Sequence, residues 1–177
     1  MPRSFEEVVL PHLDAAFNYA RWLTKNDADA QDVVQDACVR ALRFFSSLRG
    51  EDARAWLLTI VRHTWYGRFP RRAGGVGMPV AAADADVDNR ADASLNPEAQ
   101  VIQQQTVEQV RRALETLPTD FREVLVLREL EGLSYKEIAA IVGIPLGTVM
   151  SRLARARERL AGVLAISELS GGHRGLP

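Results

Sequence analysis

Apolar residues recur every three or four positions through most of the chain, which is the period of a helix with one buried face. In the N-terminal part this pattern predicts a first helix after the N-cap candidate Ser4, with an irregularity at Pro11. A second helix is predicted from about Asp29, and a third runs from about Ala53 and ends before Pro70. No segment alternates in the manner of a strand, so the sequence predicts an all-α fold.

The second and third predicted helices each separate an apolar side from a polar side. The second has as its inward side Val33, Val34, Ala37, Cys38, Ala41, Leu42 and Phe45. Its outward side comprises Asp32, Gln35, Asp36, Arg40 and Arg43. The inward side of the third helix comprises Trp56, Leu57, Ile60, Val61 and Thr64, and its outward side Thr59, Arg62, His63 and Tyr66.

The last third of the chain carries the pattern of a helix-turn-helix. Ser134, followed three residues later by Glu137, forms a capping box that predicts the start of a short helix. Gly143 supplies a turn, and Pro145 limits the start of a second, basic helix. Its predicted inward side comprises Val149, Leu153, Ala156 and Leu160. A short helix, a glycine turn and a basic helix together predict a helix-turn-helix, preceded by helices over 101–117 and 120–130.

Between these halves lies a stretch, residues 73–97, that is rich in Gly, Pro, Ala and Asp and has no apolar period. This composition is typical of a flexible linker. The sequence therefore predicts two small helical domains, residues 1–72 and 98–165, and 177 residues are enough for two small cores. Residues 166–177 are predicted to form a disordered tail.

The net charge of −1 conceals a strong asymmetry along the chain. Residues 40–72 hold eight arginines against two acidic residues and have a net charge of +6, and residues 145–161 have a net charge of +3. Residues 73–100 have a net charge of −4. Two basic surfaces separated by an acidic linker are typical of a protein that attracts nucleic-acid phosphates.

The composition argues against an enzyme, a metal protein and a membrane protein. His12, His63 and His173 are scattered, and neither a glycine-rich phosphate loop nor metal-ligand spacing is present, so we expect no catalytic site, metal or cofactor. Cys38, the one cysteine, cannot form an internal disulfide, which fits a reducing compartment. No stretch approaches the roughly 18 to 20 apolar residues of a membrane span, so a cytoplasmic protein without membrane contact of its own is expected.

Two segments resemble a known family. Residues 32–45, DVVQDACVRALRFF, together with the following RAWLLTIVRHT, resemble region 2 of bacterial sigma factors. The segment LPTDFREVLVLRELEGLSYKEIAAIVGIPLGTVMSRLARARERL resembles their region 4 in its extracytoplasmic-function (ECF) form. The resemblance implies a transcription initiation subunit that binds core RNA polymerase and directs it to promoter DNA. It further implies recognition of the minus-ten and minus-thirty-five elements, assistance in DNA melting, and an anti-sigma factor as partner.

The resemblance also implies roles for individual residues. The residues implied to bind core RNA polymerase are Asp32, Gln35 and Asp36. Those implied to contact the minus-ten element are Ser47, Arg49 and Gly50, in a loop that captures a flipped base, and Arg62, His63, Tyr66, Arg68, Arg71 and Arg72. Those implied to read the minus-thirty-five element are Thr148, Ser151, Arg152 and Arg155. The chain departs from the family where His63 replaces a frequent Asn and Met150 a frequent Lys or Arg.

Two alternative functions, and two interpretations of the linker, stay open on sequence alone. One is a sigma-like decoy that binds an anti-sigma protein without binding DNA. Another is a helix-turn-helix transcriptional regulator that binds DNA without polymerase, although the helical N-terminal half offers no receiver domain. The acidic linker, finally, is either a mimic of nucleic acid within the polymerase or a plain spacer.

Overall fold

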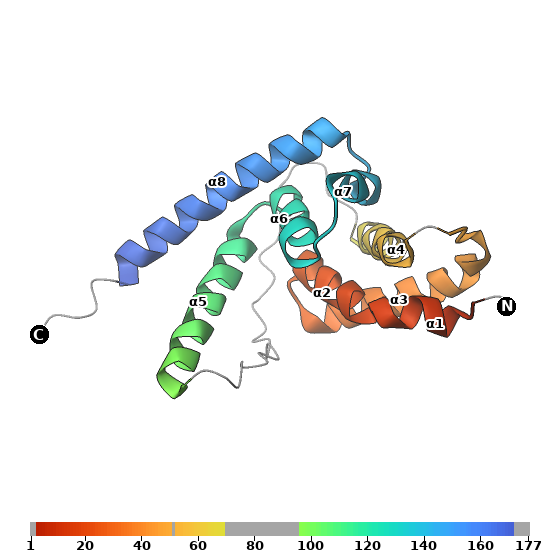
Figure 1. Ribbon diagram of the computed structural model, residues 1–177, viewed down its shortest axis with the longest axis horizontal. Helices are drawn as coiled ribbons and strands as arrows, with labels where there is room; N and C mark the ends of the chain where they lie inside the picture. The colour runs from red at the N-terminus through yellow and green to blue at the C-terminus, as the bar shows by residue number, and fades with distance from the viewer. Residues whose placement is uncertain (1–2, 51, 70–95, 172–177) are drawn as a thin grey trace, which may run out of the picture.

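The computed structural model describes residues 3–50, 52–69 and 96–171, and these residues form the all-α fold that the sequence predicts. The N-terminal half contains α1 (Phe5–Val9), a 3₁₀ turn (Leu10–His12), α2 (Leu13–Thr24), α3 (Asp27–Phe44), a second 3₁₀ turn (Phe45–Ser47) and α4 (Ala53–Arg68). The C-terminal half contains α5 (Pro97–Thr116), α6 (Thr119–Leu125), a π turn (Val126–Leu130), α7 (Tyr135–Val142) and α8 (Leu146–Gly171). Figure 1 shows α6 and α7 lying against the helices of the N-terminal half.

Local sequence explains how the N-terminal helices begin and end. Ser4 caps α1 with a complete capping box, and Pro11 breaks the first amphipathic stretch into α1, a 3₁₀ turn and α2. Lys25 ends α2 in the left-handed conformation at φ 57°, and the side chain of Asn26 caps α3. The helices α2, α3 and α4 then pack against one another in a three-helix arrangement.

The C-terminal half departs from the predicted helices after α6. Residues 120–130 were predicted to form one helix, but α6 ends at Leu125 and a π turn follows. The Glu131 amide donates to the Val126 carbonyl at 3.0 Å, and the Leu133 amide donates to the Leu127 carbonyl at 3.1 Å. Gly132, at φ 65°, then redirects the chain toward α7.

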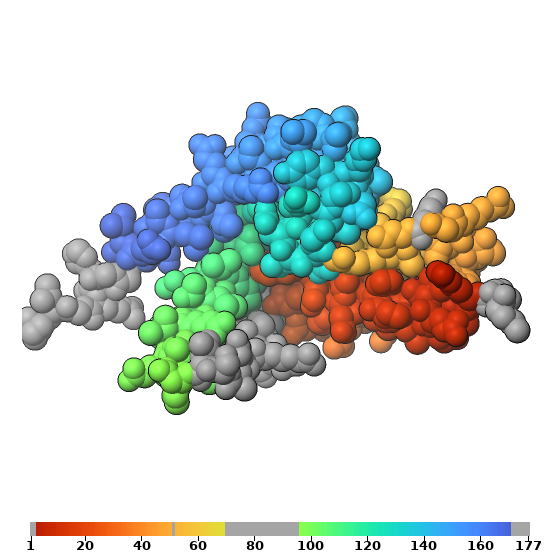
Figure 2. All heavy atoms as spheres, in the orientation of Figure 1, coloured from red at the N-terminus to blue at the C-terminus, as the bar shows by residue number. Residues whose placement is uncertain are grey.

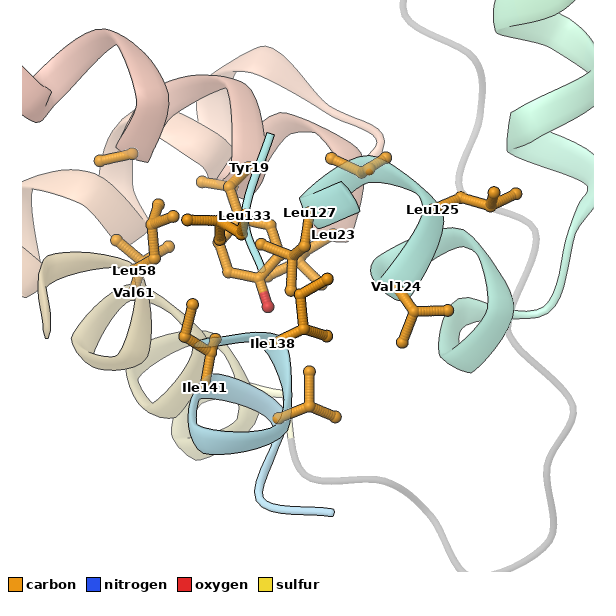
Figure 3. Packing of buried hydrophobic residues seen from close by; sticks show 14 of the residues in the cluster. Tyr19, Leu23, Leu58, Val61, Val124, Leu125, Leu127, Leu133, Ile138 and Ile141 are labelled. Atoms are coloured by element: carbon orange, nitrogen blue, oxygen red, sulfur yellow. The ribbon is translucent and has the colours of Figure 1, made fainter. Parts of the chain in front are cut away.

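The two halves share one hydrophobic core, where the sequence led us to expect two. Buried side chains of the N-terminal half, including Tyr19, Leu58 and Val61, belong to the same cluster as Leu127 and Ile141 of the C-terminal half. Figure 3 shows these residues gathered between α2, α4 and α7. In the space-filling view the surface of the C-terminal half continues directly onto the N-terminal helices (Figure 2). A helical period identifies which side of a helix is apolar, but it does not say which element covers that side.

The predicted linker and tail lie mostly outside the described residues. Residues 73–95 of the linker and 172–177 of the tail are not described, whereas Pro97 is already the first residue of α5 with Asn96 as its N-cap. The helix α8 continues to Gly171, so residues 166–171 of the predicted tail are helical. Nothing in the run Ile166 to Ser170 breaks a helix, and the first glycine after Gly162 is Gly171 itself.

In the described part of the chain, no single helix has both the length and the apolar character needed to cross a membrane. The bent pair formed by α7 and α8 meets that criterion only when its two helices are counted together, by length and composition alone. The apolar side chains of α7, including Ile138 and Ile141, are buried in the shared core.

Replacing either of two glycines, one at the end of α7 and one inside α8, by alanine should change the stability in opposite directions. Gly143 ends α7 at φ 71°, a conformation that costs an L-residue about 1–2 kcal/mol, so Gly143→Ala should lower the free energy of unfolding by about that amount. Gly162 lies inside α8 with open space around its Cα, so Gly162→Ala should raise the free energy of unfolding by about 0.5–1 kcal/mol. Urea titration followed by circular dichroism measures both, and equal shifts in the two variants would contradict the assignment of the turn.

Candidate nucleic-acid interface

The helix-turn-helix is built as its sequence predicts. The Ser134 hydroxyl accepts from the Glu137 amide at 3.2 Å, and the Glu137 carboxylate accepts from the Ser134 amide at 2.6 Å. The chain turns by 100° between α7 and α8, a value within the range of helix-turn-helix motifs. The side chains that fix α8 on the domain are fully or almost fully buried: Val149, Leu153 and Ala156.

The rest of the α8 surface near its N-terminus carries the four residues predicted to read the minus-thirty-five element. Ser151 and Arg155 are exposed, and Thr148 and Arg152 are half-buried. The Ser151 hydroxyl donates to the Thr148 carbonyl at 3.1 Å. Among the described residues neither Arg152 nor Arg155 forms an ion pair, so both guanidinium groups are available to a ligand.

Two other arginines of α8 are already occupied within the protein. Arg157 pairs with Glu129 at 2.6 Å, and that hydrogen bond is the main cause that raises the pKa of Arg157. The guanidinium of Arg159 lies over the ring of Phe121 at 4.9 Å. The basic helix is therefore divided into a free N-terminal part and a C-terminal part engaged with α6 and the π turn.

The predicted base-capture loop lies between α3 and α4. Ser47, Arg49 and Gly50 are exposed, and Gly50 adopts φ 68°. The Ser47 hydroxyl donates to the Phe44 carbonyl at 2.6 Å, which fixes the start of the loop. At its end the Asp52 carboxylate accepts from the Arg54 amide at 2.9 Å and caps α4.

The outward residues of α4 differ in their accessibility. His63 is exposed, whereas Tyr66 is half-buried with its ring against that of Trp65, the centroids 4.5 Å apart. The guanidinium of Arg62 lies over the Tyr66 ring at 4.3 Å. The side chain of Arg62 is only 17% exposed, because α6 of the C-terminal half covers it.

The group that holds Arg62 is the carboxylate of Glu123 on α6. Glu123 is fully buried, and its Oε1 accepts from Arg62 at 2.6 Å and from the Tyr19 hydroxyl. Burial opposes the charge on Arg62, but the attraction and hydrogen bond of Glu123 outweigh it and raise the pKa of this guanidinium. Burial, followed by the neighbouring carboxylate, raises the pKa of Tyr19 well above its ordinary value, so the phenol stays a donor.

Further polar contacts join the two halves around this group. Arg54 of α4 pairs with the Glu131 carboxylate at 2.9 Å and also donates to the Glu131 carbonyl. Arg122 of α6 donates to the Trp22 carbonyl at 2.9 Å, and burial lowers the pKa of its guanidinium. Lys25 of α2 donates to the Glu115 carbonyl at 2.6 Å.

The three residues predicted to bind polymerase lie together on the outer side of α3. Asp32, Gln35 and Asp36 are all exposed, while Val33 and Ala37 of the same helix are buried. The predicted inward side of α3 is wrong at its C-terminal end, since Leu42 is 60% exposed there. The three-helix packing covers α3 on a narrower strip than the apolar period indicates.

Asp36 links this surface to the predicted minus-ten residues, since it pairs with Arg68 at 3.4 Å. The remaining predicted minus-ten residues, Arg71 and Arg72, lie outside the described residues. Within the described ranges no three His, Cys, Asp or Glu side chains are arranged to hold a metal ion.

Sequence reasoning missed the acidic residues that join the halves. Glu123 precedes the buried Leu127 by four residues, so the two lie on the same side of the helix turn. An acidic residue on an apolar side requires a partner, and this pattern indicates a buried ion pair. It does not identify Arg62, which lies 61 positions earlier.

Comparison with known proteins assigns both halves. Residues 8–74 match the family described as Sigma-70 region 2, and residues 107–160 match Sigma-70 region 4. The ECF RNA polymerase sigma-E factor of Escherichia coli K12 is 40% identical over 139 residues, which cover 75% of this chain and 72% of that protein. The chain belongs to the ECF sigma factors. Sigma factors of this kind are transcription initiation factors that recognise promoters, and this family assignment holds for both halves of the chain.

Other relatives of this sigma factor agree in sequence and fold. The ECF RNA polymerase sigma factor SigE of Mycolicibacterium smegmatis is 34% identical over 92% of this chain, and the aligned part spans 62% of that relative's length. The sigma factor RpoE of Bartonella quintana, solved in complex with the anti-sigma factor NepR, superimposes with a TM-score of 0.70. That match has 31% identity and covers 92% of this chain and 97% of RpoE. CnrH, in complex with the cytosolic domain of CnrY, superimposes with a TM-score of 0.63 and 27% identity over 92% of this chain and 88% of CnrH.

The matched regions contain every described residue that the resemblance singled out. The polymerase and minus-ten positions fall in region 2, and the minus-thirty-five positions fall in region 4. The start of α5 and the last turns of α8, residues 97–106 and 161–171, lie outside both matches.

The buried hydrogen bond of Tyr19 provides a test of the polar group between the halves. Tyr19→Phe keeps the ring but removes the donor to Glu123, so the free energy of unfolding should fall by about 1.5–3 kcal/mol, the range for hydrogen bonds to charged groups. Tyr135→Phe removes a hydroxyl whose hydrogen-bond partner, Arg157, is exposed at the surface, so it should change the free energy of unfolding by less than about 1 kcal/mol. Chemical denaturation measures both, and an unchanged Tyr19→Phe midpoint would argue against the buried bond.

Proposed function

We propose that this sigma factor is a dissociable initiation subunit that binds core RNA polymerase and positions it on promoters through two DNA elements. The observation that carries the proposal is the order of the two matched regions in one chain, each with exposed polar side chains among the residues that the resemblance singled out. The chain itself supplies no chemistry. It acts through binding, in the cytoplasm, and an anti-sigma factor is its expected regulator.

The polymerase contact is assigned to the outer side of α3. Asp32, Gln35 and Asp36 occupy about one helical turn and present carboxylate and amide groups to solvent. A compact acidic patch beside basic surfaces favours a partner with basic side chains, and it orients the sigma factor on that partner. The arrangement supports binding to a protein rather than to DNA, because carboxylates repel phosphates.

The minus-ten contact is assigned to the capture loop and to α4. Ser47, Arg49 and Gly50 form an exposed loop on a rigid three-helix base, which suits a pocket for one extruded base. His63, Arg62 and Tyr66 follow along α4, and an aromatic ring beside a guanidinium offers both stacking and phosphate attraction. Capturing an unstacked base in this loop is the way in which the sigma factor assists melting.

The minus-thirty-five contact is assigned to the N-terminal part of α8. Ser151 and Arg155 lie away from the buried side of the helix and Arg152 lies at its edge, so a helix of this width placed in the major groove could bring all three to the DNA. The free guanidinium groups fit guanine edges or phosphates, and Thr148 with Ser151 offers shorter polar contacts.

The polymerase assignment predicts the effect of a double variant. Asp32→Ala combined with Gln35→Ala should weaken binding to core RNA polymerase about tenfold or more, because truncation of central interface residues commonly costs 1–2 kcal/mol or more. Asp14→Ala, at an exposed position on α2, is the matched control and should leave the affinity unchanged. Fluorescence anisotropy of labelled sigma factor with core enzyme measures the affinity.

The same assay tests the proposed function as a whole. Binding of the unaltered chain to core enzyme, followed by run-off transcription from promoters selected out of a random library, is the expected result. Failure to bind core enzyme would reject the function, and DNA binding without polymerase binding would leave a helix-turn-helix regulator in its place.

The assignment on α8 predicts a separate loss. Arg152→Ala and Arg155→Ala should each weaken binding to the selected minus-thirty-five duplex by about 1–3 kcal/mol, or about 5- to 150-fold, and leave polymerase binding intact. Arg112→Ala, on the exposed side of α5, removes one positive charge from the same domain and should have little effect on DNA binding. Equal loss of DNA and polymerase binding in the α8 variants would contradict the assignment.

A further inference from the structure

The contact between the halves covers part of the surface that the proposed function assigns to minus-ten DNA. Arg62, whose side chain is 17% exposed, lies between Glu123 and the ring of Tyr66. Its charge is therefore neutralised by a carboxylate of region 4, at the place where a phosphate would have to approach. Arginine binds carboxylate and phosphate oxygens with the same guanidinium N–H groups. The Glu123 carboxylate therefore takes the place that a phosphate would need on Arg62.

A second arginine of the basic segment is held in the same way. Arg54 lies at the start of α4, beside the capture loop, and it pairs with Glu131 at 2.9 Å. Both ion pairs join an arginine of α4 to an acidic residue at or after α6, in the segment that leads to α7. Two acidic side chains of region 4 thus occupy the basic side of α4 from its first turn to its third.

The other reading surfaces stay accessible in this arrangement. Asp32 and Gln35 on α3, and Ser151 and Arg155 on α8, are exposed. The contact between the halves is therefore selective: it covers α4 and leaves the polymerase and minus-thirty-five surfaces open.

The geometry of a promoter requires the halves to separate. The minus-ten and minus-thirty-five elements are about 25 base pairs apart, which is about 85 Å of B-form DNA at about 3.4 Å per base pair. A compact chain of this length has a radius of gyration of about 16 Å. With α4 packed against α7, the two reading surfaces cannot lie on both elements of one straight promoter.

The closed contact also contains a defect that weakens it. The second carboxylate oxygen of Glu123, Oε2, is buried without a hydrogen-bond partner among the described residues. A buried polar atom without a partner costs free energy that water would return on opening. The contact is thus held by ion pairs and apolar packing, and opening it would let water hydrate Glu123 Oε2.

We propose that Glu123 and Glu131 form an intramolecular latch that substitutes for DNA phosphate on α4 and holds the free sigma factor in a closed form unable to use Arg62 and Tyr66. This proposal rests on the proposed function for the identity of the α4 surface. Opening the latch exposes that surface, and whatever binds the open form selectively, whether polymerase or DNA, shifts the chain toward it.

The test compares two full-length double variants that change the net charge equally. Glu123→Gln with Glu131→Gln removes both latch carboxylates, whereas Glu6→Gln with Glu168→Gln removes two exposed ones. The probe is a fluorescein-labelled 20-base-pair duplex of random sequence, because phosphate contacts do not depend on sequence. We expect the latch variant to bind about tenfold more tightly than the unaltered chain, because a closed form that outnumbers the open form about ten to one can bind only through α8 and lacks the phosphate contacts of α4.

Two further measurements connect the gain to opening and to α4. Small-angle X-ray scattering should give a larger radius of gyration for the latch variant than for the charge control. Adding Arg62→Ala to the latch variant should remove most of the gain in DNA affinity. Equal DNA affinity of the latch variant and the charge control would overturn the proposal, and so would a gain that survives Arg62→Ala.

The outcome is separable from that of the proposed function, which is decided by binding to core RNA polymerase. A chain that binds polymerase but shows no latch effect loses only the latch. If circular dichroism shows that the double latch variant has lost helix, Glu131→Gln alone decides, since its side chain lies at the margin of the contact with 8% exposed. At least a twofold gain in DNA affinity over Glu168→Gln is then expected, and no gain would reject the latch.

Discussion

A carboxylate without exposed surface constrains everything packed around it, and Glu123 occupies that position between the two regions. Its partners, Arg62 and Tyr19, belong to region 2, while Glu123 itself belongs to region 4. Moving α6 away from α4 would return both charges to water, so the intact ion pair adds little net stability, but removing the carboxylate alone would leave Arg62 buried without its counterion and weaken the contact. Apolar contacts such as those of Leu58 and Ile141 supply most of the attraction, and the polar group fixes which residues face each other.

The local features of the fold could be predicted because their causes lie within a few residues of one another. The capping box of Ser134 and Glu137, the left-handed Gly143 and the break at Pro11 each depend on neighbouring positions, and each is present. The shared core could not be predicted in this way, nor could the exposure of Leu42, because both depend on which element covers a given side. Helical period carries no information about that choice.

The same distinction between local and long-range causes applies to the candidate site. Family resemblance placed Asp32 and Gln35 on an exposed side of α3 and Arg155 on the free side of α8, and the structure has them there. It also placed Arg62 on a DNA-facing surface, but it gave no indication that Glu123, 61 positions later, occupies that surface first. Contacts between the regions depend on the relative placement of two domains, and a motif that lies within one domain does not encode it.

The ion pair between Asp36 and Arg68 joins a residue assigned to polymerase with one assigned to promoter DNA. If polymerase engages Asp36, Arg68 loses its internal counterion and its attraction for phosphate increases. By thermodynamic reciprocity, DNA bound at Arg68 frees Asp36 for polymerase to the same degree. Both side chains are partly exposed, at 39% and 51%, so this exchange is limited to about 1 kcal/mol, or about fivefold in affinity. With the roles proposed for Asp36 and Arg68, this single surface pair would make the chain bind DNA slightly more tightly when it is on the enzyme than when it is alone.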